Sequence, residues 1–367
     1  MKYNISHHGR VGRKFFFNRC IDKLLIRNFA NVILKRPELA ERNLPGSAYA
    51  LPVDEDGFYP LDIGKAPIDV FNIPKLNVTD LTLPYCELLT LYEKCLGQRR
   101  VSSAMAIGTQ VHASLEQTAL DNANIKIVDI PDDLGQQSKE ESWAQKVIGQ
   151  ITNLRALKEG HRIRELYVHG DINGFLVTGY IDEVNPESGL LHIIDTKTRV
   201  NSQEPELIQQ LSAYHQVQIY HEILRQMTID PAKSITKVYS AMGLDPEKPF
   251  SVEFKEFLHN VLRTCYTDLK SLEADLMPLL QHFEGQISDT LKVEYLRKDG
   301  QLVGEAIYKF DESSFSELVN YSLGFWKGTR PPLGVQSSEL YKCFRCSMRN
   351  KCKWSALLEE RVSSGAK

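Results

Sequence analysis

Three β-rich runs that follow one another closely constrain the fold of this chain more than any other feature. They cover residues 164–169, 175–184 and 190–198. Between them lie the sequences Asp-Ile-Asn-Gly at 171–174 and Asn-Pro-Glu-Ser-Gly at 185–189. These residue types favour turns because they tolerate left-handed backbone, fix φ or hydrogen-bond to their own main chain. The three runs therefore predict an antiparallel β-meander.

Helical patterns lie on both sides of this meander. We expect helices at residues 80–97 (with Thr79 as the N-cap), 103–120, 138–160, 205–227, 252–284 and 312–324. A second hairpin is expected at 289–309, with its turn at Lys298-Asp299-Gly300. This order of elements predicts an α/β fold whose mixed central sheet is flanked by helices.

The second turn of the meander brings two aspartates and a lysine together. Asp195 and Lys197 are two residues apart on one strand, so their side chains leave the same face of the sheet. If Ser188 and Gly189 form a two-residue turn, Asp182 lies directly opposite Asp195. A loop that is two residues longer makes the two aspartates diagonal neighbours. Either register places the two aspartates and the lysine on one face.

Two carboxylates held this close repel each other by roughly 1–4 kcal/mol and need a cation between them. Mg²⁺ suits the pair, with Mn²⁺ able to replace it, because Mg²⁺ binds one or two carboxylates together with phosphate oxygens. Lys197 can then orient the attacking water and stabilise charge on a phosphate. The pattern indicates phosphodiester hydrolysis. The competing interpretation is a solvated hairpin whose Asp and Lys form a surface ion pair.

Two of the predicted helices carry polar pairs that can complete this site. His112 and Glu116 are four residues apart, so they stack on one helical face. His112 offers a neutral imidazole nitrogen as a metal ligand, and Glu116 can hold His112 or Lys197 in place. Gln216 and Tyr220 have the same spacing on the helix after the meander, and either can hydrogen-bond near the metal. Each pair can equally be the polar side of an ordinary amphipathic helix.

Three cysteines near the C-terminus lie within ten residues of one another. Cys343, Cys346 and Cys352 have the spacing C-x2-C-x5-C in a basic and aromatic context. A four-thiolate site needs one more ligand, and the candidates are Cys20, Cys86, Cys95 and Cys265. Such a site holds Zn²⁺ or an iron–sulfur cluster, and the spacing does not decide between them. Either group would tie the C-terminal segment to a distant part of the chain.

The charge of the chain is unevenly distributed. Residues 1–36 contain nine Lys or Arg and one acid, whereas the remainder has 35 basic and 46 acidic residues. We interpret 1–43 as a basic arm, either a mitochondrial transit segment or an arm that touches nucleic acid or nothing, and 44–75 as an extended connector. Residues 76–367 then form one domain, with the cysteine segment at about 335–355. No stretch approaches the ~18 apolar residues of a membrane span.

The order of these motifs resembles the RecB-type branch of the PD-(D/E)xK nucleases. The motifs are G-x-x-x-H-x-x-x-E at 108–116, G-x-x-D at 179–182, D-x-K at 195–197 and Q-x-x-x-Y at 216–220. One cysteine before this core and C-x2-C-x5-C after it resemble the iron–sulfur members of the branch, most closely the exonuclease V family. Segments 76–87 and 325–343 are similar to the opening and closing segments of that family.

The resemblance has consequences for both candidate sites. It implies Cys86 as the fourth ligand and a [4Fe–4S] cluster rather than zinc. It also implies that Asp182, Asp195 and Lys197 are the catalytic core, with His112 as a further metal ligand. The implied substrate is single-stranded DNA entered from a free end. The implied role is DNA maintenance, in mitochondria by analogy with fungal members, with the nucleus or cytoplasm as the alternative.

Two other classes of function compete with hydrolysis. A binding module built on a nuclease fold would hold single-stranded nucleic acid without cutting it, and it would not need the intact Asp182, Asp195 and Lys197. A redox protein would need a flavin or nicotinamide site, and none is recognisable. The chain also lacks the phosphate-binding loop of a helicase motor. Any unwinding must then come from a partner, such as a helicase or a single-strand-binding protein, or the substrate must already be single-stranded. We also expect a monomer.

Overall fold

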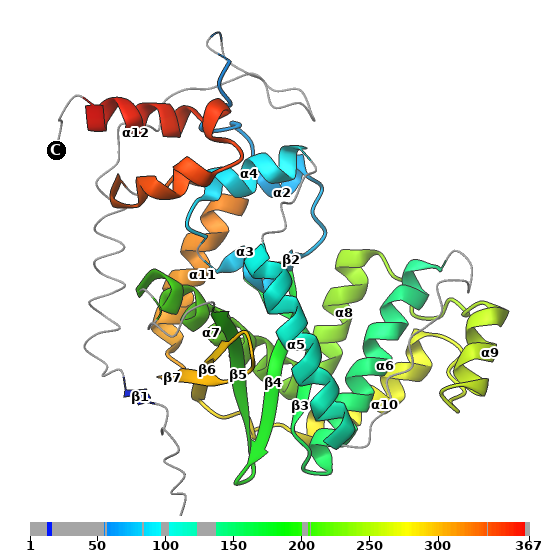
Figure 1. Ribbon diagram of the computed structural model, residues 1–367. Helices are drawn as coiled ribbons and strands as arrows, with labels where there is room; N and C mark the ends of the chain where they lie inside the picture. The colour runs from blue at the N-terminus through cyan, green and yellow to red at the C-terminus, as the bar shows by residue number, and fades with distance from the viewer. Residues whose placement is uncertain are drawn as a thin grey trace, which may run out of the picture.

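The structure is a computed structural model, shown in Figure 1, and it describes residues 13–16, 55, 57–82, 84–96, 103–122, 137–199, 205, 207–335 and 337–363. Most of the predicted basic arm, the first part of the predicted connector and Cys20 lie outside the described residues. None of the described helices has the length and apolar character needed to cross a membrane.

The described strands form one mixed sheet of seven, in the order β1-β7-β6-β5-β4-β2, with β3 paired to β4. The strands are β1 (Arg13–Phe16), β2 (Leu76–Asn77), β3 (Ile163–Ile172), β4 (Phe175–Glu187), β5 (Leu190–Arg199), β6 (Thr290–Arg297) and β7 (Leu302–Lys309). Pairing is antiparallel between β3 and β4, β4 and β5, and β6 and β7. It is parallel between β5 and β6, β2 and β4, and β1 and β7. The predicted mixed sheet and both predicted hairpin regions are confirmed.

The two turns of the meander have the conformation that their residues favour. Asn173 and Gly174 have φ angles of 49° and 90°, and Ser188 and Gly189 have φ angles of 54° and 78°. Two consecutive positive φ angles are typical of the type I′ turn, whose twist matches that of the flanking strands. As a result Glu187 pairs directly with Leu190, which confirms the register predicted for the two-residue turn.

Helices cover both faces of this sheet (Figure 1). They are α2 (Pro67–Val70), α3 (Val78–Leu81), α4 (Glu87–Leu96), α5 (Ser103–Asn122), α6 (Lys139–Lys158), α7 (Leu207–Ile229), α8 (Pro231–Met242), α9 (Val252–Asn260), α10 (Leu269–His282), α11 (Glu312–Trp326) and α12 (Lys353–Ser363). The helices predicted at 103–120, 138–160, 205–227 and 312–324 are confirmed to within a few residues.

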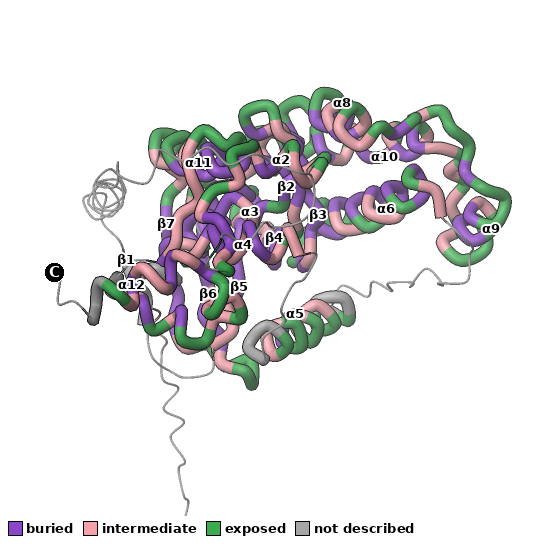
Figure 2. Tube along the Cα trace, turned by 90° about the horizontal axis from the view of Figure 1, so that it is seen from above, coloured by how far each residue is buried: buried purple, intermediate pink, exposed green. Residues whose placement is uncertain are grey.

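Helix α7 is the central helix of the fold. From Leu211 to Thr228 nearly every side chain is buried, polar ones included. A helix that is buried on all sides lies between other layers rather than on the surface. Helix α5 is the opposite case, because most of its described residues are exposed or half-buried at the edge of the molecule (Figure 2).

The single helix predicted at 80–97 is wrong, because α3 and α4 are separate helices. The N-cap is also different, since Asn77 rather than Thr79 forms the capping box with Asp80. Pro84 accounts for the break. Proline has no N–H to donate, and it disfavours the helical conformation in the residue before it.

The single helix predicted at 252–284 is also wrong, and it consists of α9 and α10. Between them Arg263 has a left-handed φ of 55°. The second helix then begins at its own N-cap, where Asp268 accepts a hydrogen bond of 2.8 Å from the Ser271 N–H. Helix α8 was not predicted. It begins at the N-cap Asp230 followed by Pro231, a pair that favours helix starts.

Candidate active site and cysteine site

Among the described residues, one edge of β4 has no pairing strand at the predicted carboxylate site, and we call this stretch the open edge of β4. On one side of this strand, β2 pairs only as far as Thr178, and the pairing with β5 begins at Glu183. Residues 179–182 therefore have no strand partner on that side among the described residues. Asp182 lies at the end of this gap, and its Oδ2 accepts a hydrogen bond of 2.7 Å from the Thr196 N–H of β5. The Asp182 carboxylate thus accepts the N–H that a backbone carbonyl of β4 would accept if the strand pairing continued.

The structure brings the predicted catalytic residues together at this opening. Lys197 Nζ lies 3.0 Å from Asp195 Oδ1 and 2.9 Å from Asp195 Oδ2. Asp195 is buried with an exposed fraction of 1%, and Asp182 is buried as well. Burial, followed by the negative charge of Asp195, raises the pKa of Asp182 to about 7. Burial would lower the pKa of Lys197, but the two aspartates raise it overall, so this lysine keeps its proton at neutral pH.

His112 reaches the same carboxylates from α5. Its Nδ1 lies 3.9 Å from Asp182 Oδ1 and 3.6 Å from Glu165 Oε1, and its Nε2 lies 3.1 Å from the Thr196 carbonyl oxygen. One ligand atom from each of His112, Glu165 and Asp182 lies within 4.8 Å of the others. The contact with Glu165 raises the pKa of His112, although burial opposes it. A divalent cation fits a nitrogen and two carboxylates gathered in this way.

Glu165 was not predicted as a site residue. It has a left-handed φ of 53° near the start of β3, a conformation that is costly for a residue with a Cβ. Its position could have been found from the sequence. The turn at Asn173 and Gly174 pairs Ile172 with Phe175, and counting back along both strands places Glu165 opposite Asp182.

Gln216 and Tyr220 both reach the site from α7, as their spacing of four residues on one helix predicts. Gln216 Oε1 accepts a hydrogen bond of 2.8 Å from Lys197 Nζ, and Gln216 Nε2 donates to the Tyr220 hydroxyl over 3.3 Å. The Tyr220 ring lies against Gly179 of β4, where a Cβ would come within 2.8 Å of Tyr220 Cε1 and 2.9 Å of Val78 Cγ2. Gly179 therefore allows α7 close enough to hold Lys197.

Glu116 lies near the site but holds neither of its predicted partners. No hydrogen bond or ion pair joins Glu116 to His112 or Lys197 within the part of the chain that the structure describes. Burial raises the pKa of Glu116, and the negative charge of Glu165 raises it further. The carboxylates of Glu116 and Glu165 are therefore close enough for their charges to interact.

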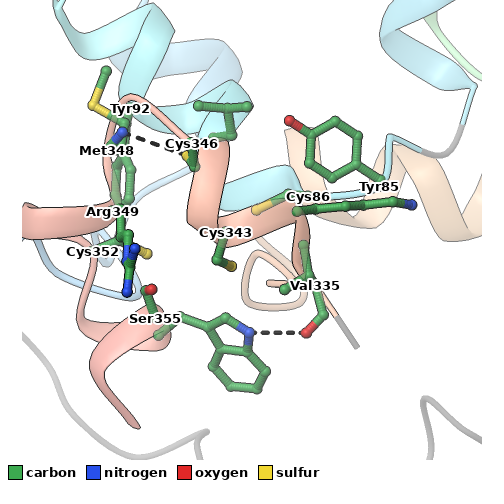
Figure 3. Close-up of a pocket in the computed structure, with 13 residues that line it drawn as sticks. Tyr85, Cys86, Tyr92, Val335, Cys343, Cys346, Met348, Arg349, Cys352 and Ser355 are labelled. Atoms are coloured by element: carbon green, nitrogen blue, oxygen red, sulfur yellow. Dashed lines mark hydrogen bonds between the residues drawn. The ribbon is translucent and has the colours of Figure 1, made fainter. Parts of the chain in front are cut away.

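Four cysteines from distant parts of the chain line one pocket. Cys86 is the residue before α4, and Cys343 lies in the 3₁₀ helix η2 (Ser337–Arg345). Cys346 directly follows η2, and Cys352 directly follows the short 3₁₀ helix η3 (Arg349–Lys351). Figure 3 shows their sulfur atoms arranged around the same space. None of the four forms a disulfide. Cys95 lies outside this pocket lining, and Cys265 is exposed elsewhere.

The surroundings of the four sulfurs suit thiolates bound to a metal group. Burial raises the pKa of Cys86 to about 12, and the three other cysteines raise it as well. Four uncoordinated thiolates are therefore unfavourable here. The Met348 N–H donates to Cys346 Sγ over 3.4 Å, and such N–H···S bonds tune ligand sulfurs.

A buried ion pair fixes the cysteine segment to α4 independently of any metal. Glu87, the residue after Cys86, has an exposed fraction of 4%. Its two carboxylate oxygens accept hydrogen bonds of 2.6 and 2.5 Å from the Arg330 guanidinium, and the Leu333 N–H donates to it over 2.9 Å. We call Glu87, Arg330 and Leu333 the clamp. Figure 1 shows the two parts of the chain side by side.

One family of known proteins matches most of the chain. A family model described as "Exonuclease V - a 5' deoxyribonuclease" matches residues 66–189, 184–271 and 255–355. The chain is 24% identical over 296 residues to exonuclease V from Danio rerio, which covers 79% of this chain and 72% of that protein. It is 33% identical over 104 residues to a protein named "Exonuclease V, mitochondrial" from Candida dubliniensis, which covers 28% of this chain and 16% of that protein.

A crystal structure of a candidate exonuclease from Eubacterium rectale also matches. It has 14% sequence identity and a TM-score of 0.33, and the match covers 76% of this chain and 88% of that one. This score is too low to support an argument about the fold or the site.

Proposed function

This chain belongs to the exonuclease V family, and from that premise we propose that it hydrolyses single-stranded DNA from a free end with the help of a divalent metal ion. The observation that supports this most is the meeting of Asp182, Asp195 and Lys197 at the open edge of β4. The family description, a 5′ deoxyribonuclease, favours attack from the 5′ end.

We propose His112, Asp182 and Asp195 as the residues that hold Mg²⁺ or Mn²⁺, and we add Glu165 because its carboxylate lies within 4.8 Å of ligand atoms of His112 and Asp182. Two observations fit a cation there. Asp182 is a buried carboxylate whose pKa is raised to about 7 without one, and the ligand atoms converge from three elements. When bound, the metal ion supplies Lewis-acid activation of a phosphate oxygen and of water.

The chain's own residues supply position and charge. Lys197 carries a proton and a positive charge that can stabilise the negative charge developing on the phosphate. Gln216 accepts from its ammonium group and so aims it, and Tyr220 fixes the amide of Gln216. We therefore propose Gln216 and Tyr220 as positioning residues, and Glu116 as a group that keeps the surroundings of His112 negative.

We propose that Cys86, Cys343, Cys346 and Cys352 hold a [4Fe–4S] cluster. The four cysteines line one pocket. The resemblance to the iron–sulfur members of the RecB-type nucleases favours the cluster over a single zinc ion. The role of the cluster is to brace the fold.

The remaining proposals concern organisation and location. We propose that residues 1–43 are a basic arm that directs the protein to mitochondria, that 44–75 connect it, and that 76–367 are a single nuclease domain. The relatives named mitochondrial exonuclease V support the location, with the nucleus or cytoplasm as the alternative. We propose a monomer that takes single strands from a helicase or a single-strand-binding protein.

The rival proposal is a binding module that holds single strands without cutting them. To separate the two, wild type and Asp195→Ala are purified without oxygen and incubated with a labelled single strand, with and without Mg²⁺. If the protein is a hydrolase, only wild type with Mg²⁺ shortens the DNA, while Asp195→Ala still binds it. If wild type binds DNA and leaves it intact with Mg²⁺ or Mn²⁺ present, and the cysteine site is fully loaded, the binding module is correct.

A further inference from the structure

A pair of lysines beside the open edge of β4 has no carboxylate partner. Lys75, the residue before β2, donates a hydrogen bond of 3.2 Å from Nζ to Thr178 Oγ1. Lys146 of α6 has its Nζ 5.4 Å from the centroid of the Tyr167 ring and 5.9 Å from that of Trp143. Both lysines are half-buried. Neither ammonium group has a carboxylate within ion-pair distance among the residues that the structure describes.

This arrangement is unfavourable as it stands. Burial lowers the pKa of Lys75, and the positive charge of Lys146 lowers it further. Burial lowers the pKa of Lys146 as well. The opposing effect on Lys75 comes from Asp80 and is smaller than either. Two partly desolvated ammonium groups that repel each other are stabilised by an anion placed between them.

The lysine pair is continuous with the carboxylate site. Thr178, which Lys75 contacts, lies four residues before Asp182 on β4, about 13 Å along an extended strand. Between them Tyr180 is 43% exposed, and its ring centroid lies 5.1 Å from that of Tyr167. Tyr180 and Asp182 are two residues apart on β4, so their side chains leave the same face of the sheet.

The exposed tyrosine has the surroundings of a stacking surface. Its ring is supported from behind by Tyr167, which is itself buried and lies under Lys146. An aromatic ring that is half-exposed and held in place can stack on a nucleic-acid base of any sequence. A positive pair next to such a ring matches the alternating phosphates and bases of a single strand, whereas a free phosphate would use only the lysines.

We propose that Lys75 and Lys146 bind one backbone phosphate of the DNA strand near the scissile one, with a neighbouring base stacked on Tyr180. This subsite rests on the proposed function, and it names the contacts that hold the strand along β4. Lys75 contacts Thr178 and Lys146 lies over Tyr167, and these two residues occupy neighbouring positions on the paired strands β4 and β3. The subsite accounts for two lysines in this place that have no ion-pair carboxylate among the described residues.

The test measures binding without cleavage. In the Asp195→Ala background, the dissociation constant for a fluorescent oligo(dT) strand is measured at several KCl concentrations for Lys75→Ala, Lys146→Ala and their combination. Each phosphate contact on a single strand contributes about 0.7 to the slope of log K against log [salt]. The expected loss of slope is about 0.7 for the double variant. Lys158→Ala is the matched control, because Lys158 is an exposed lysine on the same helix α6.

The outcomes separate this subsite from the proposed function. Unchanged slopes in the lysine variants, or an equal loss in Lys158→Ala, overturn the phosphate contact. Tyr180→Ala is expected to weaken binding roughly 5- to 150-fold, the range for loss of one stacked base, while Tyr180→Phe stays within about twofold. Equal binding by these two variants overturns the stacking. Because the background does not cut, failure of wild type to hydrolyse DNA would refute the proposed function and leave these binding results standing.

Discussion

Removing Arg330 from the clamp should destabilise the protein strongly and in a pH-dependent way. The substitution Arg330→Met keeps much of the volume but leaves Glu87 buried, with the Leu333 N–H as its remaining donor among the clamp contacts. Breaking a buried pair by removing one partner costs about 3–5 kcal/mol, because the charge left behind has no compensation. The loss should therefore be several times that of an exposed ion pair, which is worth about 0–1 kcal/mol.

The variant can avoid burying the charge by taking up a proton when it folds. For a carboxylic acid that ionises at about pH 4.3 in water, staying neutral costs about 3.7 kcal/mol at pH 7 and about 1 kcal/mol at pH 5. The difference between wild type and Arg330→Met should therefore shrink by about 2–3 kcal/mol between these pH values. Adding Glu87→Gln to Arg330→Met removes the charge, and it should recover much of the loss at pH 7 but little at pH 5.

The assay is urea unfolding followed by tryptophan fluorescence, at pH 7 and pH 5, without oxygen and at equal loading of the cysteine site. The other titrating groups are the same in all variants, so their contributions cancel when the free energies of unfolding are subtracted. A deficit below 1 kcal/mol for Arg330→Met at pH 7 would refute the reasoning. So would a deficit of the same size at both pH values, because it would mean that lost packing, and not the buried charge, dominates.

Three further predictions follow from buried groups and close contacts. Burial lowers the pKa of His169 to about 3, so below pH 6.5 the unfolded chain binds a proton here that the folded protein does not, and stability falls with pH. Between pH 7.5 and pH 5, the free energy of unfolding of His169→Phe in urea should rise by about 2 kcal/mol relative to that of wild type, and no relative rise would contradict this. Since the pKa of Asp182 is raised to about 7, protons compete with Mg²⁺, and the Mg²⁺ concentration for half-maximal activity should be roughly tenfold higher at pH 6 than at pH 8, whereas a constant value would argue against Asp182 as a ligand. Gly179→Ala places a Cβ 2.8 Å from Tyr220 Cε1, so it should lower the free energy of unfolding by about 1–3 kcal/mol and also lower kcat. The control Gly149→Ala, whose Cβ would have nothing within 4 Å, should do neither, and equal effects of the two variants would exclude close packing as the cause.

The meander could be predicted in detail because its turns have chemistry that few other conformations share. Ser188 and Gly189 specify a two-residue turn, and the period of two along the strands then places Asp182 near Asp195. The same counting from Asn173 and Gly174 would have placed Glu165 opposite Asp182. That residue was missed because its neighbours read as an ordinary strand, and nothing in the sequence marks the left-handed backbone that it adopts.

The broken helices and the long-range contacts could not be predicted for a different reason. Apolar periodicity runs through the gap between α9 and α10, so the end of one helix and the capped start of the next look like one long helix. The clamp joins Glu87 to Arg330, which are 243 residues apart, and no local pattern in the sequence pairs them. The placement of Lys75 and Lys146 likewise depends on how α6 packs against β3 and how β2 pairs with β4, which tertiary structure alone determines.

End-labelled linear and circular single-stranded DNA, digested with Mg²⁺ by wild type and Asp195→Ala, test the central claim most directly. The account predicts that wild type degrades the linear strand, releases a 5′ label before a 3′ label and leaves the circle intact, while Asp195→Ala degrades neither. Cleavage of the circle would contradict the requirement for a free end. Degradation of the linear strand by Asp195→Ala at the wild-type rate would contradict the assignment of the catalytic centre to the open edge of β4.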